Sequence, residues 1–269
     1  MLASNGLGIW YLLGDETTED EGYNMQQIPR PHQAQYLKLF SQMGEAYSVH
    51  TPRSVPTALK RGLITTSHPY QAGPFYLLLP MNVQPIQIAN FNLRELPYGN
   101  PPRLPAASSL EDYQKAVALI LQSRKTVVKV GGGGRYLGDE LEKFLELADA
   151  VVVSTPIASG AVPASNKRNM MVGGSKGSIC GNYAMDEADL LVAIGTRFVC
   201  QSDCSRTGFP KVKAVININS DVNNAMHYAD TIALVGDGRL TLEKLNAELS
   251  HREKKKSTTN SKSSAWLSA

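Results

Sequence analysis

Between residues 106 and 250, short runs of Val, Ile and Leu alternate with stretches of helical periodicity, and this alternation restricts the fold more than any other feature of the sequence. The expected strands are Thr126–Val130, Ala150–Ser154, Asp189–Gly195, Ala214–Asn219 and Thr231–Val235, and the expected helices are Leu110–Ser123, Tyr136–Ala148 and Leu240–Leu249. Continuous β-branched runs separated by helices are typical of a parallel sheet covered on both faces. The segment therefore predicts an α/β domain with a parallel, Rossmann-like sheet.

The first 83 residues predict a smaller α/β unit. Two apolar strands, Gly8–Leu13 and Pro74–Leu79, flank a helical stretch around Val55–Ile64, which makes a strand, crossover, strand unit. Such a unit normally lies beside further strands, so an incomplete α/β domain is expected here. The expected divisions are residues 1–83 for this domain, 84–105 for a linker rich in Pro, Asn and Gly, 106–250 for the larger domain and 251–269 for a flexible polar tail.

Composition and charge exclude several classes of partner. Hydrophobic residues make up 42% of the chain and charged residues 19%, which is typical of a folded globular protein. The net charge is only 27 − 24 = +3, so no nucleic-acid partner is expected. No apolar run approaches the ~20 residues that a membrane span needs, so no membrane partner is expected either. The cysteines Cys180, Cys200 and Cys204 are expected to be reduced thiols in a cytoplasmic protein, rather than zinc ligands.

Three glycine-containing loops are candidates for binding a cofactor. The loop Gly131–Gly134 lies between a strand and a helix, where glycine lets a ligand approach the backbone and the helix offers N–H groups to a phosphate. The loops Gly173–Gly177 and Gly195–Arg197 are expected at the same carboxyl edge of the sheet, where α/β sheets bind ligands. The candidate cofactor-binding residues are Gly131, Gly132, Gly133, Gly134, Gly173, Gly174, Gly177, Gly195 and Arg197.

Each of these assignments has an alternative. The run Gly131–Gly134 departs from the G-x-G-x-x-G pattern, and no acid follows the next strand to bind the ribose of NAD, so a tight strand-to-helix turn is the other interpretation. Arg197 is interpreted as a clamp for a phosphate or carboxylate, and an ion pair with a local acid such as Asp203 is its alternative.

No catalytic residue or metal ligand is predicted. Gly236-Asp237-Gly238, with Asn260 downstream, is similar to a metal-diphosphate motif, but Arg239 opens an amphipathic helix and Asn260 lies in a polar stretch. The five histidines are scattered along the chain, and each is interpreted as a surface or packing residue. The sequence contains no G-x-S-x-G nucleophile motif.

An ordered set of motifs resembles the thiamine-diphosphate-dependent enzymes of the acetolactate synthase type. Gly73–Gln84 is similar to the end of that family's pyrimidine-binding domain, and later segments follow the order of its central domain. These later segments are the glycine loop, Ser159–Pro163, Gly173–Asn182, Ala188–Phe198 and Val215–Asn219. Within the family, Ser205–Phe209 and Asn217–Asn219 look most like the trihydroxycyclohexanedione hydrolases, with acetolactate synthases and two decarboxylase groups as close competitors.

The resemblance implies a part of a larger enzyme. It covers part of the pyrimidine-binding domain and the central domain, whereas the family's activating glutamate and metal-diphosphate motif lie in other regions. It implies thiamine diphosphate with Mg²⁺ in the complete enzyme, chemistry beside a 2-oxo or cyclic dione carbonyl, and a homo-oligomer or complementary domains as partners. The chain alone is therefore expected to be inactive.

The resemblance also implies that some members hold FAD or ADP across the three glycine loops. Here Asn217 and Asn219 replace the acid often found on the later strand, so an empty, structural central domain is preferred to bound FAD or ADP. A different class of function stays open as the alternative, namely a stand-alone nucleotide-binding or oligomerisation module.

Overall fold

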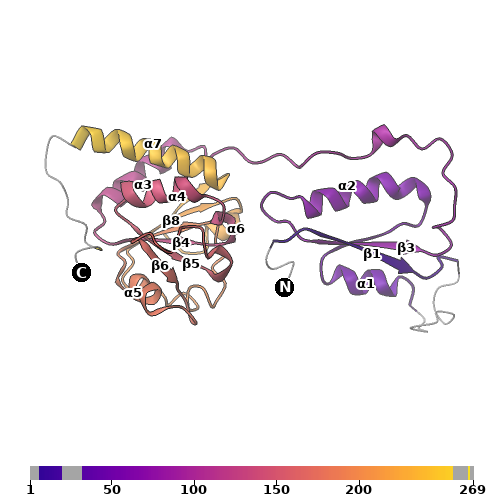
Figure 1. The fold of residues 1–269 in the computed structure, drawn as a ribbon, viewed down its shortest axis with the longest axis horizontal. Helices are drawn as coiled ribbons and strands as arrows, with labels where there is room; N and C mark the ends of the chain where they lie inside the picture. Colours follow the sequence, from indigo (N-terminus) through magenta and orange to yellow (C-terminus); the bar gives the residue numbers. More distant parts are fainter. Residues whose placement is uncertain (1–5, 20–31, 257–265, 267–269) are drawn as a thin grey trace. The chain divides into compact units, whose positions relative to one another are not determined.

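The computed structural model describes residues 6–19, 32–256 and 266, and the chain divides into two compact units between Arg103 and Leu104 (Figure 1). This division falls inside the segment 84–105 that the sequence suggests as a linker. Each unit is built on its own parallel sheet. Among the described residues, no helix combines the length and the apolar character needed to cross a membrane.

The first unit holds a three-stranded parallel sheet in the order β1-β3-β2. Its elements are β1 (Ile9–Asp15), α1 (Gln35–Ser41), β2 (Glu45–Ser48), α2 (Val55–Thr66) and β3 (Pro74–Pro80), with short 3-10 turns at Pro52–Ser54 and Leu93–Glu95. The two helices lie on opposite faces of the sheet (Figure 1). Both expected strands and the expected helix are present, whereas the sequence pattern missed β2 and α1 because both are short and of mixed polarity.

The core of the first unit is small. Its fully buried members centre on Phe75 and Leu78 of the middle strand β3. The outer strand β1 pairs with β3 along its whole length, yet the side chain of Leu12 in its middle is 66% exposed. Few buried apolar contacts therefore support this sheet.

We expect this unit to open more readily than the second. Backbone amides of β1 and β3 should exchange with deuterium at least about tenfold faster than those of the second unit's central strands, because local stability follows buried apolar contact. Hydrogen exchange read by mass spectrometry on the full chain makes the comparison. Equal protection of the two sheets would contradict the expectation.

The second unit holds a six-stranded parallel sheet in the order β6-β5-β4-β7-β8-β9. Counted within the unit this is the order 3-2-1-4-5-6 of doubly wound, Rossmann-like sheets, so the predicted fold class is confirmed. The elements are α3 (Leu110–Gln122), β4 (Thr126–Val130), α4 (Gly138–Leu147), β5 (Val151–Ser154), β6 (Asn169–Val172), α5 (Ile179–Glu187), β7 (Leu190–Ile194), β8 (Ala214–Asn219), α6 (Val222–Ala225), β9 (Thr231–Val235) and α7 (Gly238–Lys256).

Helices cover both faces of this sheet. Helices α3, α4 and α7 lie on one face and α5 on the other (Figure 1). The larger core cluster joins Tyr113 of α3 and Phe144 of α4 to the sheet, and the smaller one contains Met185 of α5. This two-sided burial explains why β4, β5 and β7 are apolar along almost their whole length.

Helices α4 and α7 differ in extent from the helices expected. Helix α4 begins at Gly138 instead of Tyr136, because a 3-10 turn over Gly132–Gly134 and a turn at Leu137 come first. Helix α7 continues to Lys256, so the first six residues of the expected flexible tail are helical. Farther along the tail, Trp266 is buried and its indole N–H donates to the Thr126 carbonyl over 3.1 Å. Most of the remaining tail lies outside the described residues.

Candidate functional site

The fold places all three glycine loops at the carboxyl ends of the second sheet's strands. Gly131–Gly134 follows β4 and Gly195 follows β7, and these adjacent strands form the point at which the strand order reverses. This is the location at which doubly wound sheets bind ligands. Gly173–Gly177 follows β6, and its Ser175 N–H donates to the Gln201 carbonyl in the loop after β7 over 2.8 Å.

At the reversal point the two loops pack backbone against backbone. The Gly131 N–H donates to the Ile194 carbonyl and the Gly133 N–H to the Gly195 carbonyl, both over 2.9 Å. A Cβ on Gly131 would lie 2.5 Å from the Gly195 oxygen, and Gly195 itself has φ +55°. These glycines are therefore required for the close approach of two chain segments, and two N–H groups proposed for a phosphate already have protein acceptors.

The Gly173–Gly177 loop is also closed on itself. The Gly174 N–H donates to the Asn182 side chain over 2.8 Å, and the Gly177 N–H donates to the Gly174 carbonyl over 2.9 Å. A Cβ on Gly173 would lie 2.6 Å from the sulfur of Met185. Ser178 caps α5 by accepting the Gly181 N–H over 3.0 Å. The loop thus anchors α5 to the sheet.

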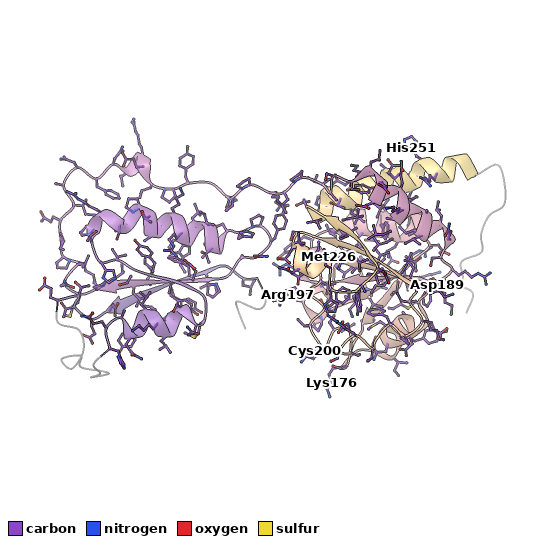
Figure 2. The ribbon with its side chains drawn as sticks, turned by 180° about the vertical axis from the view of Figure 1, so that it is seen from behind. Lys176, Asp189, Arg197, Cys200, Met226 and His251 are labelled. Carbon is purple, nitrogen blue, oxygen red and sulfur yellow. The ribbon has the colours of Figure 1, made fainter. Side chains whose placement is uncertain are left out.

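The helix after the first glycine loop is poorly suited to a phosphate. Helix α4 carries Asp139 and Glu140 in its first turn. Their carboxylates neutralise the partial positive charge of the helix N-terminus and would repel a phosphate bound there. Arg197, which Figure 2 labels, is exposed. The tight-turn interpretation of the glycine run therefore has more structural support than a diphosphate cradle.

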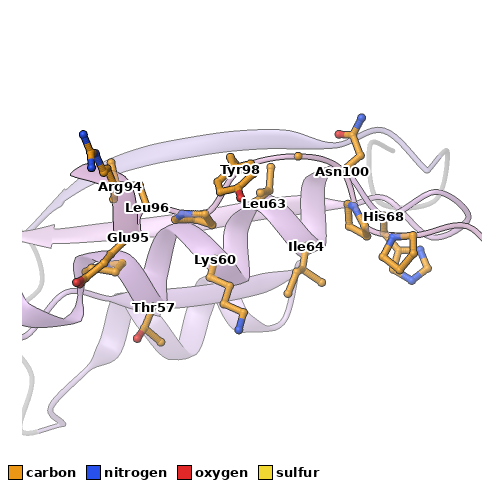
Figure 3. Close-up of a pocket in the computed structure, with 15 residues that line it drawn as sticks. Thr57, Lys60, Leu63, Ile64, His68, Arg94, Glu95, Leu96, Tyr98 and Asn100 are labelled. Carbon is orange, nitrogen blue, oxygen red and sulfur yellow. The ribbon is translucent and has the colours of Figure 1, made fainter. Parts of the chain in front are cut away.

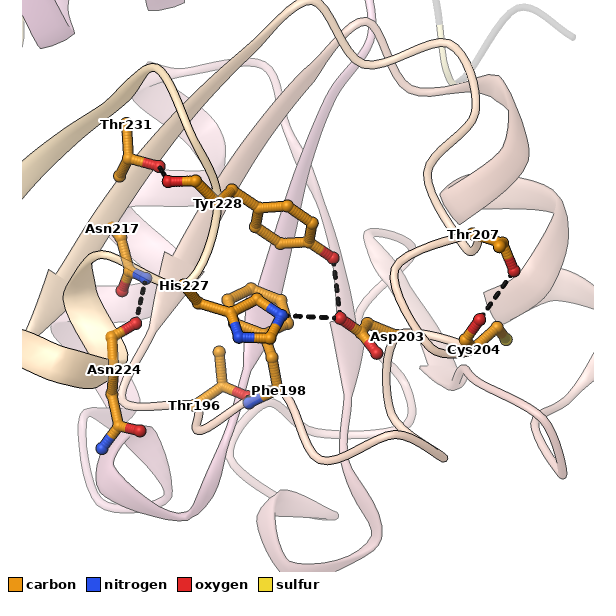
Figure 4. A network of polar contacts seen from close by, with 10 residues as sticks. All are labelled: Thr196, Phe198, Asp203, Cys204, Thr207, Asn217, Asn224, His227, Tyr228 and Thr231. Carbon is orange, nitrogen blue, oxygen red and sulfur yellow. Dashed lines mark hydrogen bonds and ion pairs between the residues drawn. The ribbon is translucent and has the colours of Figure 1, made fainter.

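A buried polar cluster lies beside these loops, and the sequence analysis missed it. Asp203 is 1% exposed, and its Oδ2 accepts the Tyr228 hydroxyl over 2.9 Å and lies 3.0 Å from His227 Nε2 (Figure 4). Phe198 stacks on His227 with ring centroids 4.9 Å apart. His227 is therefore a packing residue with a specific acidic partner, and this acid is Asp203, which the sequence suggests only as a partner for Arg197.

A buried lysine lies close to this cluster. Lys129 is fully buried in β4, and its Nζ donates to the Gly173 carbonyl over 2.8 Å. Burial lowers the pKa of this amine to about 8, although electrostatic interactions with Cys204 and Asp203 act in the opposite direction. The signal in the sequence was a charged residue inside the apolar run of β4, where a covered strand normally has none.

The residues similar to a metal-diphosphate motif have another role here. Asp237 is buried, and its Oδ1 accepts the N–H groups of Arg239 and Leu240 over 3.0 and 3.1 Å. The carboxylate thus caps α7. Across the part of the chain that the structure describes, no three His, Cys, Asp or Glu side chains converge as metal ligands. These residues do not fit Mg²⁺ with thiamine diphosphate.

The first unit carries a separate groove of about 850 Å³ (Figure 3). It runs between α2 and residues 94–102, and Leu63, Ile64 and Tyr98 give it an apolar lining. Lys60, Arg94 and Glu95 contribute charges of both signs, which selects no class of ligand. None of the predicted cofactor-binding residues lies in this groove.

Comparison with known proteins bears on the identity of the second unit. Residues 113–245 match a family described as "Thiamine pyrophosphate enzyme, central domain". Acetolactate synthase 1, chloroplastic, of Oryza sativa subsp. japonica is 28% identical over 226 residues, which are 82% of this chain and 34% of the relative. 3D-(3,5/4)-trihydroxycyclohexane-1,2-dione hydrolase of Bacillus subtilis (strain 168) is 29% identical over 214 residues, which are 77% of this chain and 33% of the relative.

Each match covers only a minor part of the relative's length. Acetolactate synthase 1, chloroplastic, of Zea mays is 30% identical over 156 residues, which are 58% of this chain and 24% of the relative. The chain thus spans about a quarter to a third of the length of these curated relatives. The resemblance to the acetolactate synthase and trihydroxycyclohexanedione hydrolase types is confirmed.

Proposed function

Residues 113–245 belong to the thiamine pyrophosphate enzymes as their central domain, and from this premise we propose that the chain is the structural middle of such an enzyme. The complete enzyme would be a lyase, hydrolase or ligase that acts on 2-oxo or cyclic dione substrates. Thiamine diphosphate, when bound elsewhere in such an enzyme, supplies the nucleophile and the electron sink. The match of residues 113–245 is the single observation that carries this proposal.

The chain's own residues support a scaffolding role. The N–H groups of Gly131 and Gly133 donate to the carbonyls of Ile194 and Gly195. The Asp237 carboxylate caps the N-terminus of α7. No step of catalysis is assigned to the described residues. In this proposal the central domain holds its sheet edge rigid, and the chemistry belongs to the parts that a complete enzyme would supply.

We expect the purified chain to show no turnover with thiamine diphosphate and Mg²⁺. Pyruvate and a cyclic 1,2-dione serve as substrates, and the Bacillus subtilis hydrolase run in parallel on the dione shows that the assay works. Isothermal titration of thiamine diphosphate with Mg²⁺ into the chain should give no binding heat. Robust turnover, or saturable cofactor binding, would contradict the proposal.

The same proposal extends to the ligands and partners suggested by the sequence. FAD and ADP should produce no thermal shift, because all the glycine amides that would contact their phosphates, except that of Gly132, have protein acceptors. Saturable binding that weakens in Arg197→Ala would instead support the nucleotide-binding alternative. A homo-oligomer and a cytoplasmic location stay predictions, to be tested by light scattering and by fractionation of the source cells.

A further inference from the structure

Lys129 contacts Met185, which lies in one buried cluster with Phe198 and Phe209 of the segment Arg197–Phe209, here called the flap. Its Nζ is 2.8 Å from the Gly173 oxygen and 3.8 Å from the sulfur of Met185 on α5. An ammonium has three N–H donors, and a thioether is a weak acceptor. The buried charge is therefore only partly compensated by these two contacts.

The backbone of the flap is strained. Phe198 has φ +48°, and Cys204, Ser205 and Arg206 have φ values of +52°, +54° and +71° in succession. Left-handed backbone is unfavourable for residues with a Cβ, and such residues gather where a structure switches or binds. The turn is held by the Ser205 N–H, which donates to the Cys200 carbonyl over 2.8 Å.

Asp203 of the flap contacts His227 and Tyr228 in the segment after α6, and we call these three residues the latch (Figure 4). Burial, and then the hydrogen bond to Asp203, raise the pKa of Tyr228, so its hydroxyl keeps its proton for donation. Yet the latch is incomplete. Among the described residues, Asp203 Oδ1 and Ser202 Oγ are buried without a hydrogen-bond partner, although buried polar groups normally have one.

We propose that the flap opens and closes over Lys129, and that loss of the proton from the Lys129 ammonium favours the closed state. The closed flap buries a charge and leaves two polar groups unpaired, and opening hydrates all three. The groups that face Lys129 or the latch are Asp203, Cys204 and Arg206 of the flap, together with His227 and Tyr228. Because the flap accepts the Ser175 N–H, its opening also frees the loop after β6.

The experiment is hydrogen exchange of the full chain with millisecond labelling, read on peptides of residues 198–209 and corrected for intrinsic rates. With a Lys129 pKa of about 8 when closed and the ordinary 10.5 when hydrated, the opening constant should fall about twentyfold between pH 7.5 and 9.5. Peptides of residues 110–147 report global unfolding, which also hydrates Lys129 and should fall with pH by a similar factor, so the flap peptides must exchange faster than these peptides at both pH values. An opening constant that is independent of pH would overturn the proposal without any variant being needed.

Three variants separate the lysine from simple packing. Lys129→Met should lower the opening constant at pH 7.5 by about tenfold and abolish its pH dependence, because no charge is then buried. Lys213→Met, which changes an exposed lysine, should leave both unchanged. Cys204→Ser should keep the pH dependence, which separates Lys129 from the thiol. A more open flap in Lys129→Met, or a pH dependence lost in Cys204→Ser, would contradict the proposal.

A fourth variant tests the contact between Tyr228 and Asp203 in the latch. Tyr228→Phe removes one of the two contacts to Asp203 Oδ2 and should raise the opening constant by about tenfold at both pH values, since hydrogen bonds to charged groups are strong. The dependence on pH should persist, because Lys129 is intact. An unchanged opening constant would show that this contact does not hold the flap.

Discussion

Gly131→Ala should lower the free energy of unfolding of the second unit by about 3 to 5 kcal/mol, a large part of the ~5–15 kcal/mol that keeps a typical domain folded. The new Cβ would lie 2.5 Å from the Gly195 oxygen and 2.5 Å from the Cα of Thr196. Both atoms are backbone in a buried loop pair joined by hydrogen bonds, so neither can move without breaking the contact between β4 and β7. Urea unfolding followed by far-UV circular dichroism measures the loss.

Gly132→Ala is the matched control for this prediction. Its Cβ would meet only methyl groups of Ile157, the nearer one at 3.3 Å, so we expect a loss of less than about 1 kcal/mol. The pair also separates two interpretations of the glycine run. If the glycines serve to let a ligand approach, both variants should fold and bind nucleotide more weakly. If they serve to pack the two loops together, Gly131→Ala alone should be strongly destabilised.

Lys129→Met should raise the free energy of unfolding by about 1 to 3 kcal/mol at pH 7. Burial lowers the pKa of this amine from 10.5 to about 8 in the folded state, and each unit of pKa shift corresponds to about 1.4 kcal/mol. Methionine has a similar length and carries no charge, so it removes this cost. The lower end of the range allows for the loss of the Nζ hydrogen bond to Gly173.

The free energy of unfolding should also depend on pH, because the pKa of Lys129 is lower in the folded chain than in the unfolded chain. Between pH 8 and 10.5 the unfolded chain holds a proton on Lys129 that the folded chain has released, so the stability of the natural sequence should rise with pH. The difference from Lys129→Met should shrink over the same range, while Lys213→Met should follow the natural sequence. Destabilisation by Lys129→Met at every pH would mean that the ammonium is compensated better than its contacts indicate.

Some features of the fold follow from local chemistry alone. Ser109 caps α3 by accepting the Asp112 N–H over 3.1 Å, and Glu111 and Asp112 lie in the first turn of this helix. The apolar runs of β4 and β7 are long enough and continuous enough to indicate covered parallel strands. In contrast, β6 was missed because it is a short edge strand in which Met171 has φ +66°.

The sequence by itself determined the fold class, the apolar strands other than the short β2 and β6, and the arrival of three glycine loops at one sheet edge. These follow from periodicity and from the rule that parallel strands end together. Only the tertiary structure decided what the loops do, because the Gly131–Ile194 and Gly174–Asn182 hydrogen bonds join residues that no local pattern relates. The burial of Lys129 was decided in the same way, since its environment comes from segments more than forty residues away, brought together by the folding of the sheet.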